Sequence, residues 1–332
     1  MSDASVMLKA NFTDLHDARF REVYEDTLKD VKTYYDKIFQ TVDSDKSYEM
    51  YSAVSGHTMM QPKAEDATGE GDKRIQGYDA TLTNDSFYLR AKISYENIKD
   101  DQFNVLEKEA ANLAEAGRIT PDIQAADAFK RGFLTTDLNG NAMTASDGIR
   151  HFSTLHYKNP DETSTTYSNA SATGVVLSDD NLETGILALE GQKNLRGLSK
   201  KCKASWLVVP PALRKTALII TGSDKRSETS DNDANVYKTM ESYYGGKLDV
   251  IIWDEIGTNT SQGTGSNTAW FLMDQKKHEL TFQWRERPYV LPVEFNTEKM
   301  RYEYPLFGRW AWGMIDWRGT WGSKGDGAAY SS

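Results

Sequence analysis

Bulky apolar side chains alternate with polar or charged ones between residues 87 and 93, which is typical of a β-strand with one buried face. The stretch before it, residues 59–78, is polar, charged and interrupted by glycine. That stretch lacks the hydrophobic side chains that would offset the entropy lost when it becomes ordered. The pattern therefore predicts an arm that is ordered only against a partner, and we expect another chain to provide the support.

Apolar residues at helical spacing predict several helices. Residues 15–39 are expected to form one amphipathic helix near the N-terminus. Residues 100–117 indicate a second helix, with an acidic N-cap and a glycine at its end. A third helix is expected over residues 120–132, because Thr120 followed by Pro121 is typical of a helix start. A single kinked helix across both stretches fits the pattern equally well.

The remainder of the chain mixes short helices and strands. Residues 134–173 are rich in Ser, Thr, Asn, Asp and Gly and are expected to form a loop with one ordered patch at 148–156. Ser178 is a candidate helix N-cap. Further strands are predicted over 206–209, 248–253, 269–273 and 309–315, and helices after Pro211 and over 236–244. This order indicates a mixed α+β fold rather than a regular βαβ repeat.

Composition limits the classes of protein that remain. The 332 residues are 39% hydrophobic and 27% charged, which is ordinary globular composition and enough for two domains. The N-terminus shows no signal pattern, and no apolar run approaches the roughly 18 residues of a membrane span, so we expect a soluble, unexported protein. Cys202 is the single cysteine, which excludes an intrachain disulfide and suits a reducing cytosol.

The net charge of -10, without a basic patch, is unfavourable for direct binding of nucleic acid. DNA near this protein is expected to be confined rather than gripped. The Trp-rich C-terminal part could form a sugar-binding platform, but the alternation of bulky residues favours core and subunit contacts.

The sequence contains few candidates for catalysis or metal binding. His151 and His156 are in the wrong phase for two ligands on one helical face, and structural contacts are favoured for both. The segment Asp137-Leu-Asn-Gly-Asn begins like a calcium loop, but Ala142 replaces the required turn glycine. Cys202 lies among lysines that could lower its thiol pKa, yet a surface turn cysteine is favoured over a nucleophile. We therefore predict no enzyme, no metal site and no cofactor.

Several stretches in a fixed order carry a resemblance to a known family. Residues 70–78 and 87–102 are similar to an extended hairpin that leads into a long helix, and residues 147–156 end in Phe-Ser-Thr-Leu-His. Residues 177–184, 206–213 and 269–272 complete the set. Together they resemble the major capsid (major head) proteins of tailed bacteriophages, which have the Hong Kong 97-type fold, and most of all their Mu-like head-subunit branch. Thr120-Pro121 departs from the family pattern, because relatives keep an unbroken spine helix there.

The resemblance implies a division of the chain. The expected parts are an N-terminal arm with an amphipathic helix along a neighbour (1–50), an E-loop hairpin (51–94), a peripheral domain with spine helix and loop (95–192), an axial domain (193–283), and C-terminal strands that return to the peripheral domain (284–332).

The resemblance also implies a function. The chain would self-assemble as pentamers and hexamers into an icosahedral shell that encloses double-stranded phage DNA without reading its sequence. The portal protein is an expected partner, with scaffolding, protease and decoration proteins as optional ones; the location would be the virion, after assembly in the host cytoplasm and without a membrane. The candidate contacts between subunits are Lys63, Lys73, Arg74, Tyr78, Phe87, Tyr88, Arg90, Tyr24 and Val31.

Two alternatives remain at this point. An encapsulin-like nanocompartment shell would use the same fold. An enzyme of unrelated α+β fold would need a clustered acid, base or nucleophile, and the sequence does not indicate one.

Overall fold

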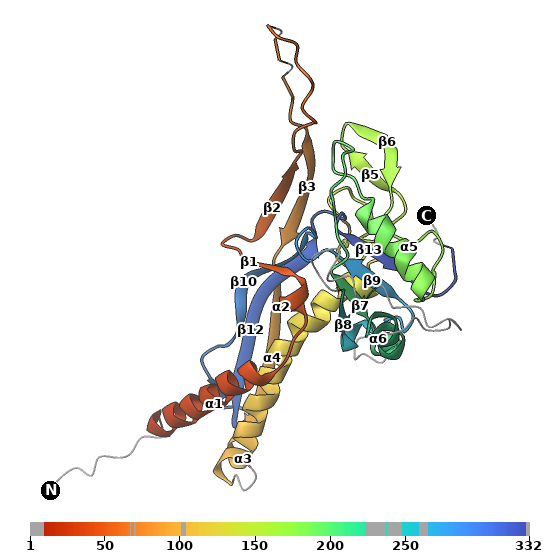
Figure 1. The fold of residues 1–332 in the computed structure, drawn as a ribbon. Helices are drawn as coiled ribbons and strands as arrows, with labels where there is room; N and C mark the ends of the chain where they lie inside the picture. Colours follow the sequence, from red (N-terminus) through yellow and green to blue (C-terminus); the bar gives the residue numbers. More distant parts are fainter. Residues whose placement is uncertain are drawn as a thin grey trace, which may run out of the picture.

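The computed structural model describes residues 10–66, 68–69, 71–100, 104–222, 237, 248–258 and 265–329, with side chains from residue 18 onward. The chain forms an elongated body from which a β-hairpin projects at one end (Figure 1). The helices are α1 (Ala10–Asp30), α2 (Tyr35–Ile38), α3 (Tyr95–Lys99), α4 (Val105–Lys130), α5 (Asp179–Glu190) and α6 (Arg214–Gly222), with the short 3-10 helices η1 (Pro211–Leu213) and η2 (Asp254–Ile256).

The strands of the described residues fall into four sheets. They are β1 (Gln40–Asp43), β2 (Tyr48–Val54), β3 (Gln76–Thr83), β4 (Asp85–Ser94), β5 (His156–Asn159), β6 (Glu162–Tyr167), β7 (Trp206–Val209), β8 (Asp249–Ile252), β9 (Trp270–Met273), β10 (Leu280–Val290), β11 (Glu294–Asn296), β12 (Arg301–Met314) and β13 (Thr320–Ser323).

A long sheet, antiparallel except where β1 pairs with β10, forms one half of the body. Its order is β1-β10-β12-β11, and β4 pairs with the other edge of β12 from Ser94 opposite Arg301 to Asp85 opposite Trp310. Helix α4 lies along this sheet (Figure 1). Leu106 and Leu113 of α4 pack there against Leu306 of β12, because the apolar stripe of the helix faces the buried side of the sheet.

A smaller sheet, in the order β13-β9-β7-β8, forms the other half together with α5 and α6. The two halves share an aromatic core in which Phe129 of α4 lies 5.0 Å, ring to ring, from Phe271 of β9. Phe152 lies 4.9 Å from the same ring. This shared core joins the two halves, and each half adds a hydrophobic cluster of its own.

The N-terminal helix differs from its prediction. The single helix expected over residues 15–39 is interrupted, because α1 ends at Asp30 and α2 covers only Tyr35–Ile38. The buried Asp122 carboxylate accepts hydrogen bonds from the backbone N–H groups of Tyr34 and Tyr35, at 2.7 and 2.9 Å, and so holds the chain in its turn. Helix α1 packs on α4 of its own chain, with Phe20 stacked on Tyr304 at 4.0 Å, and its contact with a neighbour stays a prediction.

The long helix settles a question that the sequence left open. Helix α4 runs unbroken from Val105 to Lys130, with Gly117 and Pro121 inside it, so neither residue ends or starts a helix. Gly117 is placed where a Cβ atom would lie 3.1 Å from Leu306 and 3.3 Å from the Tyr24 hydroxyl. The glycine therefore allows close approach of α1 and the sheet to the helix.

Strand β4 overturns the expectation that opened the sequence analysis. Its support is β12 of the same chain, more than 200 residues further on, and not another copy. Phe87 stacks on Trp310 at a ring distance of 4.0 Å, and Ile93 is buried in the core beside α4. The arm whose outer face is exposed is therefore the preceding β2–β3 hairpin.

Local signals elsewhere were more reliable. Ser178 caps α5 by accepting a hydrogen bond from the Asn181 N–H, and the strand predicted at 206–209 is β7. The loop predicted over 134–173 is only partly a loop, since β5 and β6 form a hairpin within it. The helix predicted over 236–244 lies outside the described residues, apart from Tyr237.

Candidate assembly surfaces

The projecting hairpin has one face on the body and one face in solvent. Alternate residues of β2 point inward, and Tyr51 donates a hydrogen bond from its hydroxyl to the Gln283 side-chain oxygen at 2.8 Å. The opposite face carries Tyr48, Met50 and Val54, which are 53%, 63% and 59% exposed. We call these three residues the hairpin stripe. A row of large apolar side chains open to water is typical of an interaction surface.

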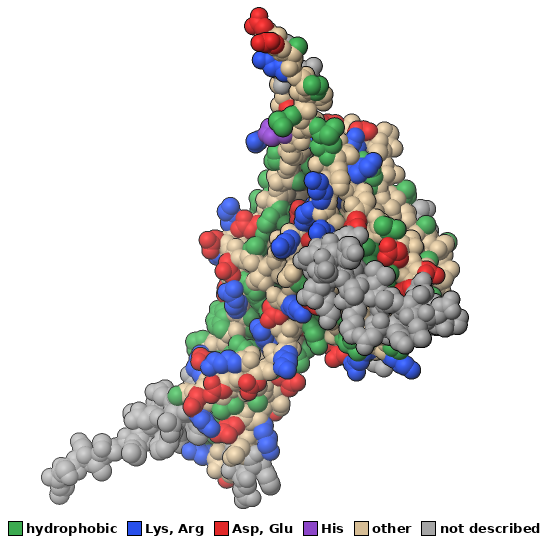
Figure 2. Space-filling model, viewed as in Figure 1, with side chains coloured by type: hydrophobic (Ala, Val, Ile, Leu, Met, Phe, Trp, Pro, Cys, Tyr) green, Lys and Arg blue, Asp and Glu red, His purple; other side chains and the backbone are tan. Residues whose placement is uncertain are grey.

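The tip of the hairpin continues this apolar character beyond the paired strands. Met59 and Met60 are 65% and 99% exposed. Lys63, Lys73 and Arg74, the basic residues predicted as subunit contacts, are also exposed there. In Figure 2 the hairpin extends well away from the body, with hydrophobic, basic and acidic side chains along it. The tip can therefore reach a surface that its own chain does not provide.

An apolar groove lies between α4 and the long sheet. It encloses a cavity of about 190 Å³ whose lining includes Ala116 and Gly117 of the helix and Leu306 of β12. Tyr88 and Leu89 of β4 stand at the groove and are 52% and 47% exposed. We call this the spine groove. Its size and lining suit one or two apolar side chains of another segment.

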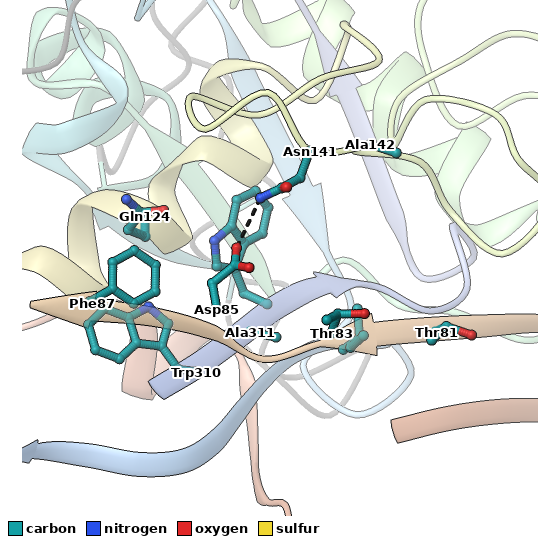
Figure 3. Close-up of a pocket in the computed structure, with 11 residues that line it drawn as sticks. Thr81, Thr83, Asp85, Phe87, Gln124, Asn141, Ala142, Trp310 and Ala311 are labelled. Carbon is teal, nitrogen blue, oxygen red and sulfur yellow. Dashed lines mark hydrogen bonds between the residues drawn. The ribbon is translucent and has the colours of Figure 1, made fainter. Parts of the chain in front are cut away.

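A second cavity of about 390 Å³ lies where β3 passes into β4, at the body end of the hairpin (Figure 3). The stacked Phe87 and Trp310 rings form one wall, and Asn141 donates a hydrogen bond to the Asp85 carboxylate at 2.9 Å across from them. Residues of three strands, of α4 and of the loop after α4 line the cavity, with Gln124 at its rim. Its lining also includes the hydroxyl groups of Thr81 and Thr83 and the aliphatic side chain of Leu82.

The histidines singled out from the sequence have packing roles. His156 is buried, with Nδ1 2.8 Å from an Asp147 oxygen and Nε2 3.0 Å from the Asn169 side-chain oxygen. Burial lowers the pKa of His151 to about 4, so this imidazole is neutral. Among the described residues no three His, Cys, Asp or Glu side chains gather where they could hold a metal ion. Nor does any helix in the described part reach the length and apolarity of a membrane span.

The expectation for Cys202 was wrong. The thiol is not on a surface turn but buried at 2% exposure within the core of the smaller sheet. Burial raises the pKa of Cys202 to about 11, and the raised pKa opposes the activation that nearby lysines suggested. The Lys200 ammonium instead lies 3.2 Å from an Asp316 oxygen.

The predicted contact residues divide into two groups. Tyr24 is buried within its own chain and donates its hydroxyl to the Pro288 carbonyl, so its role as a contact between copies stays a prediction. The others with partners in their own chain are Tyr78 with Asn159, Phe87 with Trp310, Arg90 with Glu303, and Val31 with Arg118. Lys63, Lys73, Arg74 and Tyr88 are exposed. The hairpin stripe was missed, although its alternation in residues 48–54 was a readable signal.

A projecting hairpin, a long helix across an antiparallel sheet, and a second sheet flanked by helices define the Hong Kong 97-type capsid fold. Solved capsid structures share it. The capsid of Myoviridae phage XM1 has 12% identity and a TM-score of 0.52, covering 88% of this chain and 91% of that chain. The capsid of a native GTA particle has 14% identity and a TM-score of 0.53, covering 86% and 87%. Gordonia phage Cozz has 11% identity and a TM-score of 0.51, covering 88% and 86%.

The sequence itself identifies the family. A family model described as phage capsid protein matches residues 82–322, and the chain belongs to this family. No curated protein sequence matches it. The chain is thus a structural protein of tailed-phage capsids, and the encapsulin-like alternative is the weaker one. The Mu-like branch stays a prediction.

Proposed function

We propose that this chain is the major subunit of an icosahedral phage head, and that its hairpin stripe docks on the spine groove of an adjacent copy. The observation that carries the proposal is the hairpin itself. Its inner face is satisfied by the body, and its outer face exposes Tyr48, Met50 and Val54 to water. Burying a large apolar side chain stabilises by about 1.5–3 kcal/mol, so the stripe favours association over solvent.

The stripe and the groove are different surfaces of one chain, which gives the contact a direction. Head-to-tail contacts of this kind close into rings when the rotation per subunit allows it. Rings of five and six, joined through the same contact, would build a closed shell. Tyr88 and Leu89 at the groove and Met59 at the tip supply adaptable apolar surface for both ring sizes.

The other roles follow from charge and from the proposed shell. With a net charge of -10 the subunit would enclose double-stranded DNA without sequence-specific binding. A portal protein would occupy one vertex, and scaffolding, protease or decoration proteins would be separate chains. Assembly would take place in the host cytoplasm, and the subunit would have no enzymatic role. The parts in assembly would be the arm (1–47), the hairpin (48–84), the peripheral domain (85–192 and 284–332) and the axial domain (193–283), with the hairpin bounds set by β2 and β3.

Deletion of residues 61–74 tests the proposal. The subunit should remain soluble and folded, because the body supplies the shared core, but it should no longer form shells. Negative-stain microscopy and circular dichroism of the purified protein measure the two properties. A variant that replaces the same residues with a Gly-Ser segment of equal length is the matched control for chain reach. Intact particles from the deletion would contradict the proposed role of the hairpin.

A further inference from the structure

Both limbs of the hairpin are tied together at one place, where the regular strands end. The Ser55 N–H donates to the Ile75 carbonyl at 2.9 Å, and the Ile75 N–H donates to the Ser55 hydroxyl at 2.8 Å. Slightly further out, one oxygen of the Asp72 carboxylate accepts the Thr58 N–H at 2.9 Å and lies 3.2 Å from His57 Nδ1. We call this place, where the paired strands β2 and β3 end and the tip begins, the root of the hairpin.

A single side chain from elsewhere in the body reaches both limbs at this root. Arg196 places Nη2 3.1 Å from the second Asp72 oxygen, and its Nε donates to the Ser55 hydroxyl at 3.3 Å. Its side chain is 13% exposed and that of Asp72 is 23% exposed, so the ion pair is partly shielded from water. The Thr58 hydrogen bond, aided by Arg196 and His57, lowers the pKa of Asp72, and the carboxylate stays ionised at neutral pH.

The loop that carries Arg196 is built to hold its position. Asn194 accepts hydrogen bonds through its side-chain oxygen from the N–H groups of Arg196 and Leu198, at 2.9 and 3.0 Å. The Leu195 carbonyl accepts the Asn159 side-chain N–H at 3.0 Å, and the Lys193 carbonyl accepts Arg318 Nε at 2.7 Å. Asn159 is the last residue of β5 and Arg318 lies between β12 and β13, so the loop is anchored from two sides.

The same loop also packs against the hairpin without charge. A Cβ atom at Gly77 would lie 3.1 Å from Leu195 and 2.8 Å from the Ala53 side chain. Strand β3 can therefore approach the loop only with glycine at this position. The neighbouring Tyr78 donates its hydroxyl to the Asn159 carbonyl at 3.2 Å, on the far side of the same contact.

We infer that loop 193–199 is a latch that fixes the direction of the hairpin on its own subunit before assembly, and that uniform shell size depends on it. The link between the latch and shell size rests on the proposed function, whereas the latch itself does not. A hairpin with two strands and one covered face is marginally stable alone. Without a lateral support its angle to the body would vary. In a shell, the angle between hairpin and body sets the angle between adjacent copies, and hence the curvature.

Hydrogen exchange of the unassembled subunit tests the latch. Arg196→Met keeps the aliphatic stem and removes both polar contacts, so the amides of Ser55, Thr58 and Ile75 should exchange roughly tenfold faster or more. Arg196→Lys should give an intermediate rate, because one ammonium cannot replace the two-limb contact. The matched control is Arg214→Met on exposed α6, which should leave these amides unchanged. Exchange in β10 and β12 should stay at the wild-type rate in all variants.

Particle diameters measured by cryo-electron microscopy test the second half. Wild type and Arg214→Met should give one diameter, and Arg196→Met should give a broad or mixed distribution. Root amides that exchange at the wild-type rate in Arg196→Met would overturn the latch. Faster exchange together with a single wild-type diameter would overturn its link to shell size. If wild type forms no particles at all, the proposed function fails, while the exchange measurement still decides whether the latch exists.

Discussion

Strands β12 and β2 share an alternating sequence pattern, but they differ in how far their apolar side chains are covered. Strand β12 has β10 on one side and β4 on the other, and its Tyr304 and Trp310 are 1% and 2% exposed. Among the described strands β2 pairs with β3 alone, and its Met50 is 63% exposed. Both strands alternate in sequence, but only β12 has a second layer on its apolar face. The apolar face of β12 is therefore covered within one chain, while the outer face of the hairpin is open to water and is the face that we propose another copy covers.

The largest effect should come from the core shared by the two halves. Phe271→Ala removes a fully buried ring that lies 4.9 Å from Phe152 and 5.0 Å from Phe129. The free energy of unfolding should fall by about 4 kcal/mol, from lost burial and the cavity left behind. Denaturant titration measures the change, with Met60→Ala as the control expected near zero. A loss below about 1 kcal/mol would show that the body is not one cooperative interior.

The polar junction should come next. Asp122 accepts two backbone N–H groups near α2 and the Trp253 indole N–H at 2.9 Å, which links the N-terminal segment, α4 and η2. Asp122→Ala would leave three donors unsatisfied, and we expect a loss of about 2–3 kcal/mol in unfolding free energy. Asp122→Asn keeps one acceptor oxygen and should fall between wild type and alanine. Equal losses for the two variants would mean that charge, not hydrogen bonding, holds the junction.

What could be predicted from sequence depended on the distance between cause and effect along the chain. Ser178 and Pro211 act within a few residues, so their helix starts were predicted correctly. Strand β4 was recognised as a strand, but its partner β12 lies too far along the chain for any local pattern to reveal. Gly117 was predicted to end a helix, because its neighbour Leu306 also lies far along the chain.

The candidate site was harder to predict than the fold. Charged residues such as Lys63 drew attention in the hairpin, whereas the exposed apolar residues of β2 did not. An alternating strand is equally consistent with a covered and an uncovered face, and only the tertiary structure shows which one applies. Cys202 illustrates the converse, since its flanking lysines suggested exposure while the thiol packs inside.

Acid should weaken the body through a buried imidazole. Burial lowers the pKa of His151 to about 4, below the roughly 6.5 of an unfolded histidine. The native state then binds fewer protons than the unfolded state between these values. Its contribution is complete above about pH 6.5 and is lost as the pH falls toward 4. We expect a loss on the order of 3 kcal/mol over this window.

The His151 share must be separated from a carboxylate that titrates in the same range. Burial raises the pKa of Asp127 to about 6, so its ionisation makes the native state less stable as the pH rises from about 4 to 6. The unfolding free energies of His151→Gln and wild type, measured at intervals from pH 7 to pH 4, isolate the histidine. The variant should show a shallower fall on acidification, and parallel curves would contradict the assignment.

The smallest effect on the subunit should accompany the largest effect on assembly. Changing Tyr48, Met50 and Val54 to serine removes the hairpin stripe but no buried contact of the body, so the unfolding free energy should stay within about 0.5 kcal/mol of wild type. Shell formation, followed by light scattering and negative-stain microscopy, should nevertheless be lost. The matched control changes Leu187 and Leu218, exposed residues of α5 and α6, to serine. If the stripe variant formed shells and the control did not, the proposed role of the hairpin stripe would be contradicted. The apolar surface used in assembly would then lie on the helices of the smaller sheet.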